Sequence, residues 1–353
     1  MPPTGSTRVF VGCPKLPSAL PYDAGFWAGK TAVVTGATGF LGGWTIRRLL
    51  GHGSNVIALV RHDHPESQLA LAGFDRRVTI VRGDVSDSAV VTQLFDRPLH
   101  AIFHIAANSD VERAWREPEA SISEAMRSTL ALAEQIRTRQ PRCAMVVSSS
   151  DKAYGPQAIP YREDSNLAPR HPYEVAKACQ DQIARSYGKV YDLPITVTRC
   201  ANYFGGFDFN WHRIIPGTIR SLLRGEDVVL RSDGKFTRDF LYIEDAVDCQ
   251  LLLAERSLAD ASLHGEAFNF SHEVDIEVID IVRRLISIAG RKIEPIIGNT
   301  AKAEIRFMRV SSEKAIKILN WRPRHDFDRA LVETVTWYRD YLETQPKATT
   351  GTA

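Results

Sequence analysis

Two segments in the first half of the chain carry side chains that together could remove a proton from an alcohol. Ser150 ends a serine-rich stretch after the apolar residues 144–147, and Tyr173 and Lys177 follow Pro172 with a spacing of four. Proline is tolerated in the first turn of a helix, and residues four apart share one helical face. A free tyrosine has a pKa of about 10, and a nearby ammonium group favours its phenolate form. The pattern predicts a phenolate base beside a lysine.

The significance of the Tyr173–Lys177 pair depends on the elements that precede it, because a Tyr-x-x-x-Lys pair alone occurs by chance on many exposed helices. The apolar residues 144–147 are typical of a buried parallel strand. Ligands of open α/β sheets bind at the carboxyl ends of such strands. Ser150 would therefore face the same cleft as the helix that carries Tyr173.

A glycine-rich turn near the start of the chain predicts a dinucleotide site. Apolar residues 31–35 lead directly into a G-x-x-G-x-x-G turn, and residues 44–50 have helical spacing. Such a unit brings backbone N–H groups and a positive helix N-terminus against a pyrophosphate, where a Cβ atom would intrude. A plain turn is the alternative. The predicted NAD(P) contacts here are Gly36, Thr38, Gly39, Phe40, Leu41 and Gly42.

The second predicted strand, residues 55–60, bears on the choice between NAD and NADP. In NAD-binding folds an acidic residue near this strand end commonly accepts a hydrogen bond from the ribose 2′-hydroxyl. Here Val60 occupies that place and Arg61 follows it. A guanidinium could pair with the 2′-phosphate of NADP, but a solvated arginine is an equally good interpretation. The sequence leaves NAD and NADP open.

Composition excludes several classes. With 353 residues and 44% apolar content, the chain can bury a large core. A formal charge of +2 argues against non-specific binding to nucleic acid or a membrane surface. The cysteines, scattered and without a C-x-x-C pair, predict a reducing compartment and no metal site. No apolar run approaches about 18 residues, and the start lacks a secretory pattern. We expect a cytoplasmic protein.

From about Trp27 to Tyr341, the chain resembles the extended short-chain dehydrogenase/reductase family, and more closely its NAD(P)-dependent sugar-nucleotide epimerases and dehydratases. Ser150, Tyr173 and Lys177 fall at the family's catalytic Ser/Thr, Tyr and Lys. The resemblance implies a Rossmann-type α/β fold with a doubly wound parallel sheet, a smaller C-terminal α/β substrate lobe and a retained cofactor.

Further matches extend the implied cofactor site. Asp84 and Val85, after a strand predicted at residues 78–81, resemble the family's adenine contact, although Asp84 or Ser86 could instead cap a helix at residues 89–95. Ser148 is a further predicted cofactor contact.

The fourth predicted strand, residues 101–105, carries the family's His-x-Ala-Ala pattern. Its small residues Ala106 and Ala107 would let the chain pass close to the cofactor. His104 lies within an apolar run, and we interpret it as a hydrogen-bonded core histidine rather than a proton carrier. In relatives, the helix predicted at residues 119–139 packs on a second subunit, so the resemblance implies a homodimer.

The second half of the chain resembles the family's substrate side. Asn202 belongs to an R-x-x-N segment, and Arg238 opens a match to R-D-x-x-Y-V-x-D that would pair with the substrate diphosphate. A salt bridge from Arg238 to Asp239 or Asp245 is the structural alternative. The predicted substrate-binding residues are Asn108, Asn202, Arg213, Arg238 and Arg309, with Arg306 as a weaker candidate.

Asp151 and Lys152 bear on which reaction follows C4 oxidation. An epimerase returns the hydride to a rotated 4-keto intermediate, whereas a 4,6-dehydratase must also remove the C5 proton and expel the C6 hydroxyl. Lys152 could act on the C5 proton and Asp151 on the leaving oxygen. An ion pair that only shapes the strand end is the alternative. Ser150-Asp151-Lys152 resembles CDP-glucose 4,6-dehydratases, although Ser150 replaces the usual threonine.

We therefore predict a nucleotide-sugar 4,6-dehydratase, CDP-type, that uses NAD or NADP. The alternatives are a 4-epimerase, a 5,6-dehydratase and a non-catalytic NAD(P)-binding protein. The predicted organisation is an irregular extension at residues 1–26, a Rossmann domain at 27–200 with returns from 235–270, a mainly substrate-binding lobe at 201–343 and a flexible tail at 344–353.

Overall fold

Seven parallel strands form the central sheet of the computed structural model, which describes residues 20–300 and 305–344. Most of the predicted extension and tail lie outside the described residues. The strand order is β11-β6-β5-β4-β1-β2-β3, and every neighbouring pair is parallel. The strands are β1 (Thr31–Thr35), β2 (Asn55–Val60), β3 (Thr79–Arg82), β4 (Ala101–His104), β5 (Ala144–Ser148), β6 (Ile195–Cys200) and β11 (Ala267–Phe270). The predicted Rossmann-type fold is confirmed.

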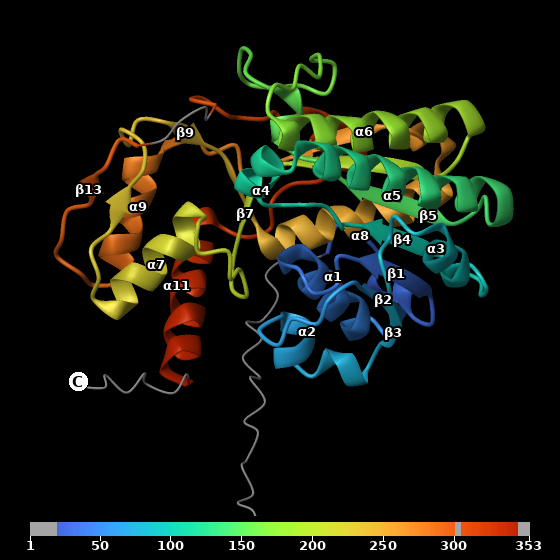
Figure 1. Ribbon diagram of the computed structural model, residues 1–353, viewed down its shortest axis with the longest axis horizontal. Helices are drawn as coiled ribbons and strands as arrows, with labels where there is room; N and C mark the ends of the chain where they lie inside the picture. Colours follow the sequence, from blue (N-terminus) through green and yellow to red (C-terminus); the bar gives the residue numbers. More distant parts are fainter. Residues whose placement is uncertain (1–19, 301–304, 345–353) are drawn as a thin grey trace, which may run out of the picture.

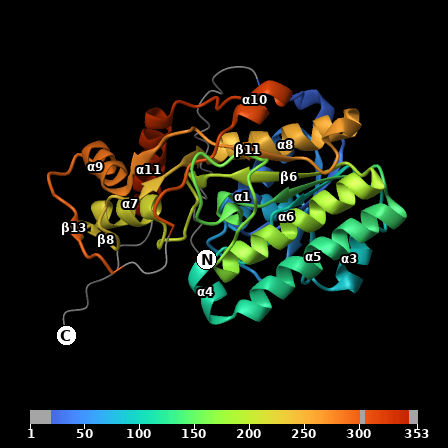
Figure 2. The ribbon, with the colours of Figure 1, turned by 90° about the horizontal axis from the view of Figure 1, so that it is seen from above.

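Helices cover both faces of this sheet, which explains why its central strands are continuous apolar runs. Figure 2 shows α5 and α6 side by side on one face and α8 on the other, and α1 packs against α8. The helices of this part are α1 (Phe40–Gly51), α2 (Gln68–Leu71), α3 (Ser88–Leu94), α4 (Val111–Arg116), α5 (Pro118–Arg139), α6 (Pro172–Tyr191) and α8 (Ile243–Ala259). The short 3₁₀ helices are η1 (Ala24–Trp27), η2 (Phe74–Arg76), η3 (Asp151–Tyr154) and η4 (Ala261–Leu263).

The smaller lobe lies beside the carboxyl ends of the strands (Figure 1). Its helices are α7 (Ile214–Arg224), α9 (Val278–Ile288) and α11 (Phe327–Thr344), whereas α10 (Glu313–Leu319) packs against β11 of the main sheet. Three two-stranded pairs complete the lobe: β7 (Asn202–Phe204) with β10 (Phe240–Tyr242), β9 (Thr237–Arg238) with β12 (Ile276–Glu277), and β8 (Val229–Leu230) with β13 (Ile296–Ile297). The chain returns from this lobe through α8 and β11, which join the main sheet.

Helix α3 corrects one sequence interpretation. Its N-cap is Asp87, whose side chain accepts the N–H of Ala89, so neither Asp84 nor Ser86 caps this helix. Asp84 instead accepts hydrogen bonds from the N–H and the hydroxyl of Ser86, both at 2.8 Å. The tight turn after β3 therefore frees Asp84 to lie beside the cavity described below.

Helix α5 buries some of its apolar side chains and leaves others exposed. Ala125, Ala133 and Ile136 are buried, whereas Met126 and Leu130 are exposed. Two apolar side chains one turn apart thus remain on the surface of the helix that the sequence assigns to a subunit contact.

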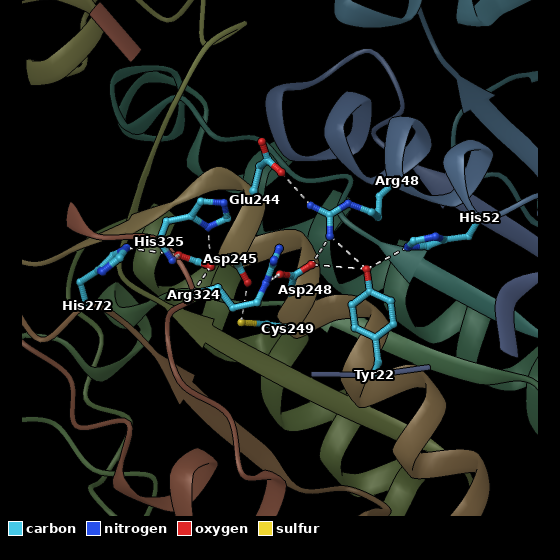
Figure 3. Close-up of polar contacts among 10 residues, drawn as sticks. All are labelled: Tyr22, Arg48, His52, Glu244, Asp245, Asp248, Cys249, His272, Arg324 and His325. Carbon is cyan, nitrogen blue, oxygen red and sulfur yellow. Dashed lines mark hydrogen bonds and ion pairs between the residues drawn. The ribbon is translucent and has the colours of Figure 1, made fainter. Parts of the chain in front are cut away.

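A buried polar network holds the two parts together (Figure 3). Arg48 of α1 contacts Glu244 and Asp248 of α8, and Arg324, from the segment before α11, donates to Asp248 at 2.6 Å. Tyr22 also bonds to this carboxylate. Buried charges of this kind are stable only when paired, so the network fixes how α1, α8 and the lobe meet.

Asp245, at the start of α8, forms the second half of the network. His325 Nδ1 lies 2.8 Å from one of its oxygens and His272 Nε2 lies 3.4 Å from the other. Burial acts to raise the pKa of Asp245, but the two nearby histidines and the Arg324 N–H lower it to about 2. The carboxylate therefore stays ionised and ties the lobe to α8 at neutral pH.

Within residues 20–300 and 305–344, the apolar length of every helix falls short of what a membrane crossing requires.

Candidate active site

A cavity of about 1540 Å³ opens at the carboxyl ends of the sheet strands and reaches into the smaller lobe. It is lined by all five predicted catalytic residues, namely Ser150, Asp151, Lys152, Tyr173 and Lys177. The predicted cofactor residues that line it are Gly36, Thr38, Gly39, Phe40, Leu41, Arg61, Asp84, Val85, Ala106, Ala107 and Ser148, and the predicted substrate residues are Asn108, Asn202, Arg213 and Arg238. Residues distributed from 36 to 238 thus meet around one space.

Two glycines of the turn after β1 are required by close backbone packing. Gly36 has φ +67°, and a Cβ atom on it would lie 3.0 Å from the nitrogen of Ala106. Gly42 does not line the cavity, but a Cβ there would lie 2.1 Å from the carbonyl oxygen of Gly36. Because Gly39 caps α1 without a side chain, the first N–H groups of the helix are left for a ligand. This cradle fits the pyrophosphate of NAD(P).

Arg61 lies between two acidic side chains at the ribose end of the cavity. Its Nη1 donates to Asp84 at 3.2 Å and to Glu124 of α5 at 3.4 Å. Burial acts to raise the pKa of Asp84, but hydrogen bonds from Ser86 and from Arg61 lower it overall. The Arg61 guanidinium is therefore paired with two carboxylates at the position where the sequence allowed an interaction with the 2′-phosphate of NADP.

Ser150 and Asp151 form a short hydrogen-bonded unit at the start of η3. The Ser150 hydroxyl donates to Asp151 Oδ1 at 2.9 Å and accepts the N–H of Lys152 at 3.2 Å. Asp151 is 2% exposed, and among the described residues its Oδ2 has no hydrogen-bond partner. Burial raises the pKa of Asp151, and the charge of Lys152 opposes this only in part. Burial of this kind favours the protonated form of a carboxyl group.

Lys152, on η3, lies beside the start of helix α6. Its Nζ is 5.7 Å from the centroid of the Tyr173 ring. The predicted acid, the predicted second base and the tyrosine are therefore gathered on one side of the cavity, over the end of β5.

The electrostatic surroundings of Tyr173 differ from those expected from the sequence alone. Burial raises its pKa, and the largest opposing charge is that of Arg213, at the start of α7; a hydrogen bond with Ser150 also lowers it. Arg213 is held by Asp208, with Nη1 and Oδ2 3.0 Å apart. A guanidinium from the smaller lobe therefore favours the phenolate.

Lys177 is a buried residue of the cavity wall. Its Nζ donates to the carbonyl oxygen of Ser148 at 2.7 Å and to Gln180 Oε1 at 3.2 Å. Burial lowers its pKa to about 8. The lysine is fixed at the end of β5, next to the residues that would hold a nicotinamide ribose.

The predicted substrate-binding residues differ in the partners of their polar groups and in whether they line the cavity. The side-chain amide of Asn202 donates to the carbonyl oxygen of Asp239 at 3.0 Å, and that of Asn108 donates to Ser121 at 2.9 Å. Arg309 does not line the cavity, and its Nη1 lies 3.7 Å from Asp275. Arg306 likewise lies off the cavity wall, beside Asp233.

Arg238 reaches the cavity from β9. Its Nη1 donates to the carbonyl oxygens of Thr237 and Ile305, at 2.8 and 2.9 Å. The acids proposed as its alternative partners serve other groups, because Asp239 accepts backbone N–H groups and Asp245 belongs to the network that joins the two parts. These contacts orient the guanidinium toward the substrate side of the cavity wall.

The description of the matching family model, NAD dependent epimerase/dehydratase family, agrees with this arrangement, and the match covers residues 32–270. The chain belongs to this family. The family match and the cradle after β1 identify the protein as an NAD(P)-dependent nucleotide-sugar dehydratase or epimerase, and the predicted membership of the extended short-chain dehydrogenase/reductases is confirmed.

The similar proteins include some that are named dehydratases and others that are named epimerases. The chain is 27% identical over 331 residues to a dTDP-glucose 4,6-dehydratase of Xanthomonas campestris pv. campestris, with 87% of this chain and 93% of the relative covered. It is 26% identical over 312 residues to a UDP-glucose 4-epimerase of Mycolicibacterium smegmatis, with 87% and 98% covered. The solved dTDP-glucose 4,6-dehydratase DesIV of Streptomyces venezuelae, with NAD bound, superposes with a TM-score of 0.78 at 26% identity, covering 88% of this chain and 97% of that one.

Three further cavity residues, His171, Glu174 and Trp115, were not found by sequence reasoning. His171 caps α6 by accepting the N–H of Tyr173, and Glu174 accepts the N–H of His171 in return. The ring of Trp115, on α4, stacks on that of His171 with centroids 5.8 Å apart. The capping-box pattern of His171 and Glu174 is visible in the sequence, whereas the contact with Trp115 depends on the fold.

Proposed function

We propose that the protein is a nucleotide-sugar 4,6-dehydratase that converts an NDP-hexose to an NDP-4-keto-6-deoxyhexose and water, with a CDP carrier as the first candidate. The observation that supports this proposal is the buried Asp151, which lines the cavity with Lys152 and Tyr173 and whose Oδ2 has no hydrogen-bond partner among the described residues. An epimerase would have no use for a second proton donor at this place. The CDP carrier rests on the resemblance of Ser150-Asp151-Lys152 and of residues 36–44 to CDP-glucose 4,6-dehydratases.

The proposed mechanism divides proton transfers among the five residues. Tyr173 removes the proton of the C4 hydroxyl, which Ser150 orients, and Lys177 and Arg213 stabilise the phenolate. The turn after β1 would hold NAD(P), which would supply the hydride acceptor for C4 and the hydride donor for C6. Lys152, in its neutral form, removes the C5 proton, exchanges it with solvent, and delivers a solvent proton to C5 after water has left. Asp151 donates a proton to the C6 oxygen, so one water leaves, and the proton taken by Tyr173 restores Asp151.

The two parts of the chain have separate tasks in this proposal. Residues 27–200, with the returns from 235–270, hold NAD(P), and residues 201–343 mainly hold the nucleotide sugar. The homodimer stays a prediction, for which the exposed Met126 and Leu130 of α5 are the proposed contact; sedimentation of the wild-type protein tests it.

The experiment that tests elimination is incubation with CDP-glucose, and in parallel dTDP-, UDP- and GDP-linked hexoses, in deuterated water. A 4,6-dehydratase gives a product that has lost one water and carries deuterium at C5. Isomerisation without a mass change would instead establish the second candidate, a 4-epimerase, which the Mycolicibacterium smegmatis relative favours.

Replacing Lys152 by alanine is expected to separate the two halves of the reaction. Oxidation at C4 should persist within about tenfold, whereas water loss should fall by about 10²- to 10⁴-fold, because general acid–base steps typically contribute that much. Nicotinamide absorbance and product mass in a single turnover measure the two steps. Lys317→Ala on α10, an exposed lysine, is the matched control. Equal loss of both steps would show that Lys152 does not serve elimination.

We also expect NAD to bind at least about tenfold more tightly than NADP. A 2′-phosphate would have to share Arg61 with the carboxylates of Asp84 and Glu124, and like charges in close contact are unfavourable. Calorimetric titration of cofactor-free protein measures both dissociation constants. Glu124→Gln should reduce the ratio of the NADP dissociation constant to the NAD dissociation constant. Glu119→Gln, at an exposed position of the same helix, should leave this ratio unchanged. Equal affinity for the two cofactors contradicts the interpretation.

A further inference from the structure

Lys177 has a partner that its own catalytic motif does not include. The amide of Gln180, three residues later on α6, accepts a hydrogen bond from Lys177 Nζ at 3.2 Å and is 1% exposed. An ammonium group only donates, so the Gln180 oxygen must face the lysine. Its NH₂ group therefore points the other way, into the protein.

This NH₂ group contacts the ring of His104 at the end of β4. Gln180 Nε2 lies 3.2 Å from His104 Nε2 and 3.3 Å from the hydroxyl of Thr129. The Thr129 hydroxyl donates to the carbonyl oxygen of Ala125 at 2.9 Å, as does the neighbouring Ser128 at 3.1 Å. Thr129 Oγ1 and Ser128 Oγ also lie 3.2 and 3.4 Å from His104 Nε2. If Nε2 carried a proton, it and the Gln180 NH₂ group would be two donors facing each other at 3.2 Å, so the contact favours an unprotonated Nε2 that accepts from Gln180.

The other ring nitrogen then carries the proton and donates it to the end of β1. His104 Nδ1 lies 3.1 Å from the hydroxyl oxygen of Thr35, which also accepts the N–H groups of Ile105 and Ala106 at 3.0 Å each. Burial, followed by the charge of Lys177, lowers the pKa of His104 to about 3, which keeps the ring neutral. The expected core histidine is therefore one link of a longer chain.

This chain connects the lysine with both loops of the cofactor cradle. Thr35 directly precedes Gly36, and Ala106 is the residue against which Gly36 packs. Every link is buried, so each polar group depends on the next for its hydrogen bonds, and such networks act as units. A change at Gln180 would be felt at the lysine and at the cradle together.

We propose that Gln180 is a positioning residue: it holds Lys177 and, through the Nδ1–H form of His104 and the hydroxyl of Thr35, keeps the lysine in register with the turn at Gly36 and the loop at Ala106. The consequence for catalysis rests on the proposed role of Lys177 beside Tyr173. Gln180 itself touches neither substrate nor cofactor in this assignment and acts through the lysine.

The proposal predicts opposite effects of two substitutions on the pH dependence of C4 oxidation. Gln180→Leu removes an acceptor from the Lys177 ammonium, so the lysine loses its proton at lower pH. Gln180→Glu places a carboxylate there, so the lysine keeps its proton to higher pH. The other titratable groups around Lys177 are Tyr173 on the same helix, His104 on β4, and Asp151 and Lys152 on η3, and both variants retain all of them.

The measurement is the pH profile of single-turnover hydride transfer by the holoenzyme. For Gln180→Leu we expect a roughly 10- to 100-fold lower rate, an alkaline limb at lower pH and a KM that is little changed. For Gln180→Glu we expect the alkaline limb at higher pH. Gln182→Leu, an exposed glutamine two residues further along α6, should match the wild type. If the alkaline limb of the pH profile lies at the wild-type pH in both Gln180 variants, the proposal is wrong.

A second measurement does not depend on activity and so separates this proposal from the proposed function. In wild-type holoenzyme with ¹⁵N-labelled histidine, the His104 resonances, assigned by their absence in His104→Gln, should show the Nδ1–H tautomer from about pH 5 to 8. An Nε2–H tautomer would require the Gln180 amide to be reversed and would overturn the proposal. C4 oxidation precedes both elimination and epimerisation, so an epimerase result leaves this test intact.

Discussion

Replacement of Tyr173 by phenylalanine is expected to lower kcat by about 10³- to 10⁴-fold while KM for the nucleotide sugar changes by less than about threefold. Phenylalanine keeps the ring that packs at the start of α6 but lacks the oxygen that takes the C4 proton. Binding by the smaller lobe is therefore retained while the first chemical step fails. Both elimination and epimerisation require this step, so the prediction holds for either.

The pH dependence of C4 oxidation by the wild-type enzyme should reflect ionisation of the Tyr173 hydroxyl. Its burial raises the pKa of Tyr173, and the charge of Arg213 lowers it, so the active phenolate form is populated as pH rises. Single-turnover C4 oxidation should accordingly increase with pH along an acid limb. Arg213→Met removes the opposing charge and should move this limb to higher pH.

The matched control for Tyr173→Phe is Tyr191→Phe, at the exposed end of the same helix. This variant should keep the wild-type kcat, because its hydroxyl is far along α6 from the cavity. A kcat for Tyr173→Phe within about tenfold of the wild type would show that another group removes the C4 proton.

The sequence predicts the cofactor half of the cavity well because local patterns determine it. The strand–turn–helix unit at Gly36 needs only neighbouring residues, and β1, β2, α1 and α6 lie where the apolar patterns place them. The spacing of Tyr173 and Lys177 likewise fixes their common face before any tertiary contact is known. Periodicity and glycine spacing are enough for these features.

Contacts between distant segments could not be predicted in the same way. Arg61 looked like a phosphate ligand or a solvated side chain, but Glu124, 63 residues later, lies beside it. Arg213 was predicted only as a substrate contact, yet its charge acts on Tyr173. The alternative interpretation of Asp84 or Ser86 as a helix cap was wrong, because the helix begins later and Asp87 caps it. Each outcome depends on how α5, α7 or the turn packs, which no local pattern encodes.

Replacement of Arg199 by methionine is expected to destabilise the protein by about 3–5 kcal/mol, the largest stability effect that we predict. Arg199 of β6 and Asp181 of α6 are both fully buried, and two hydrogen bonds of 2.7 and 2.8 Å join them. Arg199 also donates to the hydroxyl of Tyr154 at 2.9 Å, at the end of η3. Methionine would leave the Asp181 carboxylate buried without its counter-charge.

Two further variants make the stability argument specific. Arg283→Met on α9 breaks an exposed ion pair with Glu294 and should cost no more than about 1 kcal/mol in the same urea titration. Arg199→Met combined with Asp181→Leu removes both charges and should recover most of the loss, because the penalty comes from the uncompensated charge rather than from the missing bond. If the double variant is as unstable as the single one, the guanidinium stabilises the fold mainly by packing against Tyr154. That result would also argue against a role for the Arg199–Asp181 ion pair in holding η3 against α6. Helix η3 contains Asp151 and Lys152, and α6 carries Tyr173.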